Sequence, residues 1–355
     1  MKLYYPKSHY NKQYRSELFP LLKPFIKGEG FTDEARMAMY GISEKDITIC
    51  ETPDTAEVFV LPMSWNYYTQ QKQLTLALEF IALAKGVGKM VWSFIAGDYG
   101  VRIPKFDHVM VFRLGGYKSQ NLNNHMAMPV FIGDYLTEHE QLNHYLPSDY
   151  SKKPIVGFCG QADASKKKAF FDVLKKMRHN SKSLLKLHVF ENEPFISTSY
   201  LRAQLLKRLS NHDGIDENFI LRKHYRAGIT GQKQTHRTTF EFYNNILESQ
   251  YVLCVRGGGN FSVRFYETLM MGRIPIYMHT DGLLPLSDVI DWKRHLVWVE
   301  SHERHIVAEK VVSFHNNLTP ELFFKLCESN RKLWEEHLTL KGFFQSVIQK
   351  TLRKY

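Results

Sequence analysis

The sequence predicts an α/β protein built as two domains, and three observations support this fold class. Short apolar runs typical of buried strands alternate with helical patterns along most of the chain. Residues 251–292 contain, in order, a buried strand, a glycine-rich loop, a helix and a second strand, which is the order of a parallel βαβ unit. With 355 residues and 44% hydrophobic content, the chain can bury more than one core.

The first half contains four segments with the composition of buried strands. They are Val58–Leu61, Lys89–Ile95, Val109–Leu114 and Val130–Ile132. A core helix, Leu74–Lys85, lies between the first two. We expect these elements to form a first Rossmann-like domain, residues 1–150. The polar stretch His139–Lys153 contains Pro147 and Asp149 and is the predicted linker.

The second half begins as a Rossmann-like domain should. A strand at Pro154–Cys159 meets a turn at Gly160-Gln161 and then a helix that starts at Ser165. Further strands are predicted at Leu184–Phe190 and Phe219–Arg222, and the helix Phe240–Ser249 leads into the strand Tyr251–Val255. We expect this second domain to cover residues 151–320. Residues 321–355 are amphipathic helices, which we expect to cross back to the first domain.

A glycine-rich loop follows the strand Tyr251–Val255. Ser262 is the expected N-terminal cap of the next helix, which Gly272 ends before a strand at Ile274–Met278. The amides of such a loop, and the positive end of the helix, point beyond the carboxyl end of the strand, where anions bind. The loop consists of Arg256, Gly257, Gly258, Gly259 and Asn260.

Two arginines and one carboxylate make this loop a candidate nucleotide site. Each guanidinium, of Arg256 and of Arg264, offers paired donors to a diphosphate. Glu267 lies one turn after Arg264 and can accept hydrogen bonds from a ribose diol. The alternative is an ordinary loop followed by an i,i+3 ion pair on a solvated helix. Because Pro275 and a second turn at Asp281-Gly282 follow, we favour the nucleotide site.

These residues resemble the exostosin family of glycosyltransferases. The resemblance is strongest in the second half, and the first half adds Thr55–Pro62 and the turn Ala96–Gly100, in which Gly97 stands where the family often has histidine. The second-half motifs, in family order, are Leu253-Cys254-x-Arg256-Gly257, Arg264-x-x-Glu267-x-Leu269, Gly272-x-Ile274-Pro275-Ile276 and Leu284-Pro285-Leu286-Ser287-Asp288-Val289-Ile290-Asp291-Trp292.

The resemblance implies the GT-B architecture, two Rossmann-like domains facing a central cleft. The second domain would hold a nucleotide diphosphate sugar, with UDP as the expected nucleotide, and the first would hold the acceptor. The implied reaction is inverting hexosyl or glycuronosyl transfer to a glycan or a lipid-linked oligosaccharide in surface polysaccharide synthesis. The chain lacks an Asp-x-Asp pattern, so we expect metal-independent transfer in which basic groups neutralise the leaving group.

Further site residues follow from the resemblance. Arg226 matches a second basic contact to the diphosphate, or else lies in a surface loop. Gly160 and Gln161 are placed where such enzymes touch the donor or the acceptor, although a tight turn explains Gly160 equally well. Inversion requires a base from the first domain, and Asp98 is the first choice by position. Its rivals are His108, His125 and Asp134, and any of the four could instead be structural.

Charge is concentrated in residues 151–240, which contain 18 Lys and Arg against 7 Asp and Glu. Their excess equals the +11 net charge of the whole chain. Such a segment suits a nucleotide diphosphate, a lipid-linked acceptor at an anionic membrane, or nucleic acid. Lys166–Lys168 and Lys175-Lys176 also fit the solvated face of a helix. Without a nucleic-acid motif, we do not expect nucleic acid as a partner.

Four single cysteines, Cys50, Cys159, Cys254 and Cys327, fit a reducing compartment. The N-terminus lacks the apolar run of a signal peptide. These observations, and the bare chain expected of bacterial members, predict a cytoplasmic protein with peripheral contact at the inner membrane face.

A second function class stays open. Exostosins work in pairs, so the chain could be a catalytically weak partner subunit in a homo- or hetero-oligomer that binds nucleotide-sugar or glycan. Retention of Arg256, Arg264 and Glu267 favours an intact donor site. The missing histidine beside Asp98 leaves the acceptor chemistry open.

Overall fold

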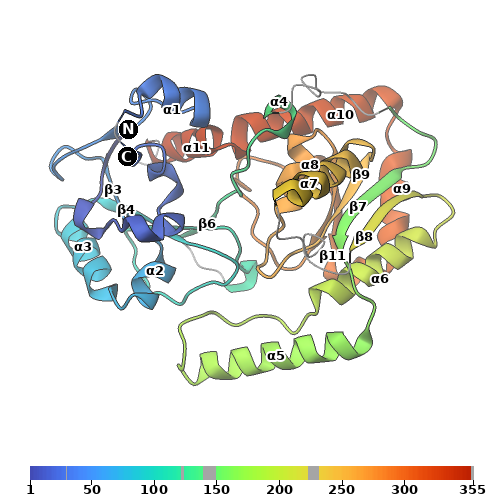
Figure 1. The fold of residues 1–355 in the computed structure, drawn as a ribbon, viewed down its shortest axis with the longest axis horizontal. Helices are drawn as coiled ribbons and strands as arrows, with labels where there is room; N and C mark the ends of the chain where they lie inside the picture. The colour runs from blue at the N-terminus through green and yellow to red at the C-terminus, as the bar shows by residue number, and fades with distance from the viewer. Residues whose placement is uncertain (29, 121–123, 139–148, 223–231, 353–355) are drawn as a thin grey trace.

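The chain forms two lobes, each built around a parallel sheet (Figure 1). The computed structural model describes residues 1–28, 30–120, 124–138, 149–222 and 232–352. The first sheet has the strand order β2-β1-β3-β4-β5-β6 and the second has the order β11-β10-β9-β7-β8. The strands are β1 (Lys2–Tyr4), β2 (Thr48–Ile49), β3 (Val58–Val60), β4 (Met90–Ile95), β5 (Val109–Arg113), β6 (His125–Ala127), β7 (Ile155–Gln161), β8 (Asp216–Arg222), β9 (Tyr251–Cys254), β10 (Ile274–His279) and β11 (Val297–Glu300).

Helices pack around both sheets and extend between the lobes (Figure 1). They are α1 (Asp33–Tyr40), α2 (Trp65–Gln70), α3 (Leu74–Gly86), α4 (Tyr135–Glu138), α5 (Lys166–Leu184), α6 (Thr198–Ser210), α7 (Gln232–Leu247), α8 (Val263–Met270), α9 (Val307–Asn316), α10 (Pro320–Leu333) and α11 (Leu340–Leu352), with a π-helical turn at Trp334–Leu338 before α11. No helix in the described ranges combines the length and apolar character needed to cross a bilayer.

The strand order of the second sheet reverses between β7 and β9. From β7 the chain moves outward to β8, and then returns to place β9 on the other side of β7. The connections therefore leave the carboxyl ends of β7 and β9 in opposite directions, which is the arrangement in which parallel α/β sheets form a ligand crevice. Gln161 ends β7 and Cys254 ends β9, so these two residues mark the point where the strand order reverses.

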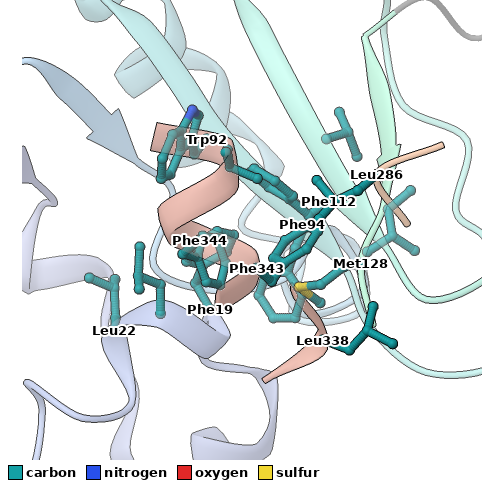
Figure 2. Close-up of a cluster of buried hydrophobic side chains, with 14 of the residues drawn as sticks. Phe19, Leu22, Trp92, Phe94, Phe112, Met128, Leu286, Leu338, Phe343 and Phe344 are labelled. Carbon is teal, nitrogen blue, oxygen red and sulfur yellow. The ribbon is translucent and has the colours of Figure 1, made fainter. Parts of the chain in front are cut away.

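The last helix of the chain completes the core of the first lobe (Figure 2). Phe343 and Phe344 of α11 are 0% and 1% exposed. The ring of Phe344 lies 5.6 Å from that of Phe112 on β5 and 6.1 Å from that of Trp92 on β4, and 5.8 Å from that of Phe19. Tilted and stacked aromatic contacts of this kind add to the favourable free energy of burial.

Most of the predicted elements are confirmed. The strands at Val58, Lys89, Val109, Pro154, Phe219, Tyr251 and Ile274 correspond to β3, β4, β5, β7, β8, β9 and β10. Gly272 follows α8 with a φ of +61°, a backbone conformation that favours glycine and ends the helix. The sequence analysis missed β1, β2, β6 and β11 and several helices, because these elements are short or lack clear periodicity. Residues 139–148 of the predicted linker lie outside the described residues.

Two predicted strands are wrong. Val130–Ile132 has no strand structure, and the last strand of the first sheet is β6, which ends before Pro129. Proline has no amide hydrogen to donate, so it does not continue a ladder. Leu184–Phe190 is also not a strand: α5 runs to Leu184, and only Phe190 makes an isolated bridge, to Val101. The three leucines of this segment, Leu184, Leu185 and Leu187, are exposed instead of buried in a sheet.

Two parallel α/β lobes facing each other confirm the predicted GT-B fold class. Lobe-to-lobe contacts include the bridge between Val101 and Phe190 and a second bridge between Tyr117 and Gly282. The carboxyl ends of strands from both sheets therefore meet at the inter-lobe surface.

Replacing Phe344 with Ala should destabilise the first lobe by about 3–5 kcal/mol, because truncating a buried phenylalanine leaves a cavity. Chemical denaturation followed by tryptophan fluorescence measures this, since Trp92 stacks on Phe344. Phe170→Ala is the matched control: that ring is 61% exposed, so its loss should change stability by less than about 0.5 kcal/mol. Equal effects of the two substitutions would contradict the packing of α11 against the first sheet.

Candidate donor and acceptor site

Arg264 lies at the carboxyl ends of β7 and β9, where the strand order reverses. Arg264 is in the first turn of α8. Ser262 occupies the N-cap position of this helix with an extended backbone, and its side chain makes no capping hydrogen bond. The Arg264 Nη2 atom donates to the carbonyl of Cys159 at 2.7 Å, and Nη1 donates to that of Leu253 at 3.5 Å. One guanidinium therefore connects the carboxyl ends of both strands at the point where the sheet reverses.

Aromatic rings flank the Arg264 guanidinium. Its carbon lies 4.3 Å from the ring centre of Phe158 and 5.6 Å from that of Phe242. Burial lowers the pKa of this guanidinium, although arginine stays charged. A Cβ atom on Gly160 would lie 2.7 Å from Nη2, so a side chain there would displace the arginine. The structure thus brings together two of the predicted donor-site residues, Gly160 and Arg264.

Glu267 lies one turn after Arg264 and is half-buried. The hydroxyl of Tyr243, on α7, donates to its Oε1 atom at 3.4 Å. Burial, with the nearby negative charge of Glu267, raises the pKa of Tyr243, so this tyrosine stays a neutral donor. The Tyr243 ring also stacks on that of Tyr135, with 3.7 Å between ring centres. The carboxylate of Glu267 is therefore held beside an aromatic surface.

The glycine-rich loop packs directly against the turn that contains Asp98. A Cβ atom on Gly258 would lie 2.7 Å from Asp98 Oδ2, and one on Gly259 would overlap the backbone of Asp98. Gly257 donates its amide to the carbonyl of Phe261 at 2.9 Å, which closes the loop. Gly258 and Gly259 therefore allow the close approach of the first lobe, in addition to any approach of a ligand.

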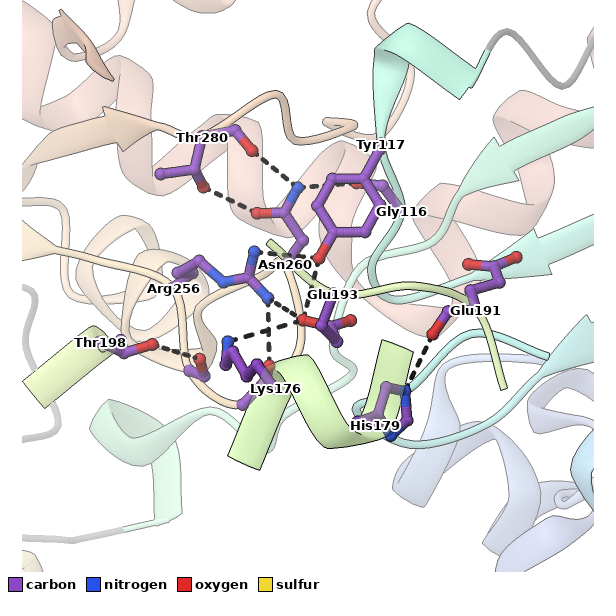
Figure 3. Close-up of polar contacts among 12 residues, drawn as sticks. Gly116, Tyr117, Lys176, His179, Glu191, Glu193, Thr198, Arg256, Asn260 and Thr280 are labelled. Carbon is purple, nitrogen blue, oxygen red and sulfur yellow. Dashed lines mark hydrogen bonds and ion pairs between the residues drawn. The ribbon is translucent and has the colours of Figure 1, made fainter. Parts of the chain in front are cut away.

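Arg256 is 3% exposed and takes part in a buried polar network (Figure 3). Its Nη2 atom donates to Glu193 Oε2 at 2.8 Å and to the carbonyl of Gly258 at 3.1 Å. Its Nη1 atom donates to the hydroxyl of Tyr117 at 3.0 Å, and that hydroxyl donates to Glu193 at 3.0 Å. Lys176 lies 3.9 Å from the same carboxylate oxygen, and its pKa is lowered by burial and by Arg256. Arg256 thus holds the glycine-rich loop and both lobes together.

Asn260 has a similar linking role (Figure 3). Its Nδ2 atom donates to the carbonyls of Gly116 at 2.8 Å and of Thr280 at 2.9 Å. Its Oδ1 atom accepts a hydrogen bond from the Thr280 hydroxyl at 2.7 Å. The whole amide is therefore used to join the loop to β10 and to the first lobe.

A second buried ion pair joins the lobes. Arg113, at the end of β5, donates through Nη1 and Nη2 to the two oxygens of Glu191, at 3.0 and 2.6 Å. The two side chains are 3% and 9% exposed. Gly100 passes so close to this pair that a side chain there would overlap both partners. Glu191 and Glu193 lie on one short segment, so a single loop of the second lobe carries both ion pairs.

A hollow of about 590 Å³ lies between the lobes, at the carboxyl ends of β10 and β11. Its polar lining includes an imidazole–carboxylate pair: His279 Nδ1 and Glu300 Oε2 are 2.7 Å apart. Tyr117 and Glu193 line this hollow and also a smaller one that Asp98 borders. The volume is within the range of small-molecule sites.

The four candidates for the catalytic base have different surroundings in the structure. Asp134 forms an ion pair with Arg331, and His108 bonds through Nε2 to the carbonyl of Ile81. Burial, with the charge of Arg113, lowers the pKa of His125 to about 4. Asp98 is exposed and borders the inter-lobe surface beside the glycine-rich loop. It is therefore the candidate with a carboxylate open to an acceptor.

The sequence-predicted residues form two groups. Gly160, Arg264 and Glu267 lie at the end of β7 and on α8. Arg256, Asn260 and the three glycines lie where the loop meets the Asp98 turn. Arg226 falls outside the described residues. The sequence analysis missed Glu191, Glu193 and their partners Arg113 and Tyr117. The sequence signal that could have identified this segment is the pair of acidic residues, two positions apart, within a strongly basic part of the chain.

Comparisons with known proteins identify the family of this chain. The Exostosin GT47 domain matches residues 7–311. An Exostosin-1 homolog of Caenorhabditis elegans is 28% identical over 99 residues, which are 28% of this chain and 25% of the relative. The match therefore spans about a quarter of that curated relative.

Among solved structures, TarM is similar with a TM-score of 0.35 and 11% identity, over 74% of this chain and 50% of TarM. A complex of Staphylococcus aureus TarM with fondaparinux, α-GlcNAc-glycerol and UDP gives the same TM-score, 0.35, and identity, 11%, over 75% and 50% of the two chains. WaaG, a glycosyltransferase involved in lipopolysaccharide biosynthesis, has a TM-score of 0.31 and 8% identity, over 98% and 99% of the two chains.

Replacing Glu191 with Ala should destabilise the protein by about 3–5 kcal/mol, because it leaves the Arg113 guanidinium buried without its carboxylate. Denaturant unfolding measures the loss, and the double variant Arg113→Met with Glu191→Leu should recover most of it. Glu51→Ala is the control, since Glu51 pairs with Lys7 in solvent and its loss should leave the unfolding midpoint nearly unchanged. A Glu191→Ala variant as stable as the control would contradict an interface that depends on this pair.

Proposed function

Because the chain belongs to the Exostosin GT47 family of glycosyltransferases, we propose that it transfers a sugar with inversion from a UDP-sugar to a glycan or a lipid-linked oligosaccharide in surface polysaccharide synthesis. Hexosyl and glycuronosyl donors both fit this proposal. The single observation that carries it is the position of Arg264, whose guanidinium connects β7 and β9 where the second sheet reverses.

The donor would lie along the crevice and the start of α8. Arg264 supplies a fixed positive charge, Gly160 lets the diphosphate approach the backbone, and the amides at the start of α8 add the positive end of the helix. Ser262 could donate its hydroxyl to a phosphate, since it makes no capping bond. Glu267 accepts hydrogen bonds from the ribose hydroxyls. Arg256 and Asn260 hold the glycine loop in place, and the charge of Arg256 lies behind it.

Transfer then requires one proton acceptor in the first lobe. Asp98 would take the proton from the acceptor hydroxyl as its oxygen attacks the anomeric carbon. The bond between that carbon and the diphosphate oxygen breaks, and UDP leaves with the electron pair on the opposite face of the sugar. Arg264 and the helix end stabilise the charge that develops on the leaving group, so the proposed step uses basic side chains without a metal ion.

The acceptor would occupy the hollow between the lobes. Its walls come from both lobes, and two of its lining residues, Tyr117 and Glu193, also border the smaller hollow beside Asp98. The glycan would therefore approach Asp98 from the side of β10 and β11, opposite the crevice that would hold the nucleotide.

UDP or its sugar conjugates should raise the thermal stability of the protein, and Glu267→Ala should remove most of the effect. A ligand at about a hundred times its dissociation constant adds about 2.7 kcal/mol, which a thermal-shift assay detects readily. GDP, CMP and their conjugates test the choice of nucleotide. Glu309→Ala, an exposed glutamate on α9, is the matched control and should keep the full shift.

Absence of stabilisation by every nucleotide, in a folded protein, would contradict the donor site. The proposal of a catalytically weak partner subunit makes a different prediction: nucleotide binding persists, but no sugar is transferred to any acceptor.

Asp98→Asn should lower the transfer rate by a factor of about 10² to 10⁴, because the amide cannot accept the hydroxyl proton. The thermal shift with UDP should be unchanged, since Asp98 does not take part in the proposed donor binding. Product formation from a radiolabelled donor measures the rate, and Asp54→Asn, an exposed aspartate, serves as the control. Full activity of Asp98→Asn would move the role of base to another residue.

A further inference from the structure

Helix α5 has two different faces. One face contacts the rest of the protein and holds the segment Glu191–Ser197. Asn180 exchanges hydrogen bonds with the backbone of Glu193 at 2.7 and 2.8 Å, His179 bonds to the carbonyl of Glu191 at 3.0 Å, and Asp172 accepts from Ser197 at 2.7 Å. The helix lies outside the two lobes (Figure 1). Its opposite face is left to solvent.

The solvent face carries large apolar side chains in one row. At 100° per residue, positions i, i+4, i+7 and i+14 share a ridge of a helix. Two further leucines, Leu185 and Leu187, continue the apolar surface beyond the helix, each 70% exposed. The ridge consists of Phe170, Leu174, Met177 and Leu184, which are 61%, 40%, 48% and 70% exposed.

A basic row lies directly beside the apolar row. Residues 166–186 contain eight Lys and Arg and one acidic residue, Asp172, which faces the protein. Within this row, Phe171 adds a further exposed ring, 50% exposed. The basic row consists of Lys167, Lys175, Arg178 and Lys182, all exposed. With 19 residues, the helix presents these two rows over about 28 Å.

We propose that the outer face of α5 binds the surface of an anionic lipid membrane, with the helix lying parallel to that surface. Its apolar row would insert among the acyl chains while the lysines contact lipid phosphates, as in other interfacial amphipathic helices. Charge complementarity favours this partner over a second copy of the chain, because two α5 helices would bring their basic rows together. The proposal is independent of the donor site.

Flotation with lipid vesicles tests the proposal. The full chain should float with vesicles of phosphatidylglycerol and phosphatidylcholine in equal parts, and should stay in solution with phosphatidylcholine alone. Replacing Phe170, Leu174 and Met177 together with Ser should lower the partition coefficient by about tenfold or more. Replacing Lys167, Lys175 and Lys182 with Glu should lower it by roughly fivefold or more for each lysine. Added salt should weaken binding of the wild type.

The matched control replaces exposed leucines elsewhere, Leu83 on α3 and Leu322 on α10, with Ser. This variant should float like the wild type. Circular dichroism and the thermal midpoint establish that each variant is folded, which surface substitutions should permit. A wild type that stays in solution with anionic vesicles at low salt would overturn the proposal, as would equal loss of binding in the control. Self-association that depends on Phe170, Leu174 and Met177, without vesicle binding, would assign this face to an interface between copies.

Discussion

The carboxylate of Glu193 joins the glycine-rich loop, the first lobe and helix α5. Its Oε2 atom receives hydrogen bonds from Arg256 of the second lobe and Tyr117 of the first, and Lys176 of α5 lies near it. Buried ionised groups are stable only when their partners are in place. The glycine-rich loop, the first-lobe loop and α5 therefore all contact one buried group. The bidentate pair of Arg113 and Glu191, which lies two residues before Glu193, adds a second link between the lobes.

In this arrangement the glycine-rich loop has a second physical role, the contact with the first lobe. A sequence with three consecutive glycines predicts a close approach of ligand to backbone. The structure adds the close approach of Asp98, which leaves no space for side chains at Gly258 and Gly259. The same residues thus bring the candidate base of one lobe against the candidate donor loop of the other. Any motion that separates the lobes would also separate these two groups.

The sequence predicted local structure well and long-range partners poorly. The strand, loop, helix and strand from Tyr251 to Met278 were predictable because hydrophobic periodicity and glycine placement are local signals. The partner of Arg256 was not predictable, since Glu193 is 63 residues away and is brought near by α5. The strand wrongly predicted at Leu184–Phe190 also depended on a long-range partner that the sequence does not reveal. Its leucines have the composition of a strand, but the fold offers them no neighbouring strand, and they remain on the surface.

The packing of α11 against the first sheet has a consequence for synthesis on the ribosome. Phe19, Trp92 and Phe112 are among the early parts of the chain, yet their aromatic neighbour Phe344 is made near its end. Domains usually fold in the order in which they emerge. Here the first lobe would emerge with an incomplete core and keep apolar surface uncovered while the entire second lobe is translated. We therefore expect the nascent chain to need chaperones during this interval, and the two lobes to complete their folding together.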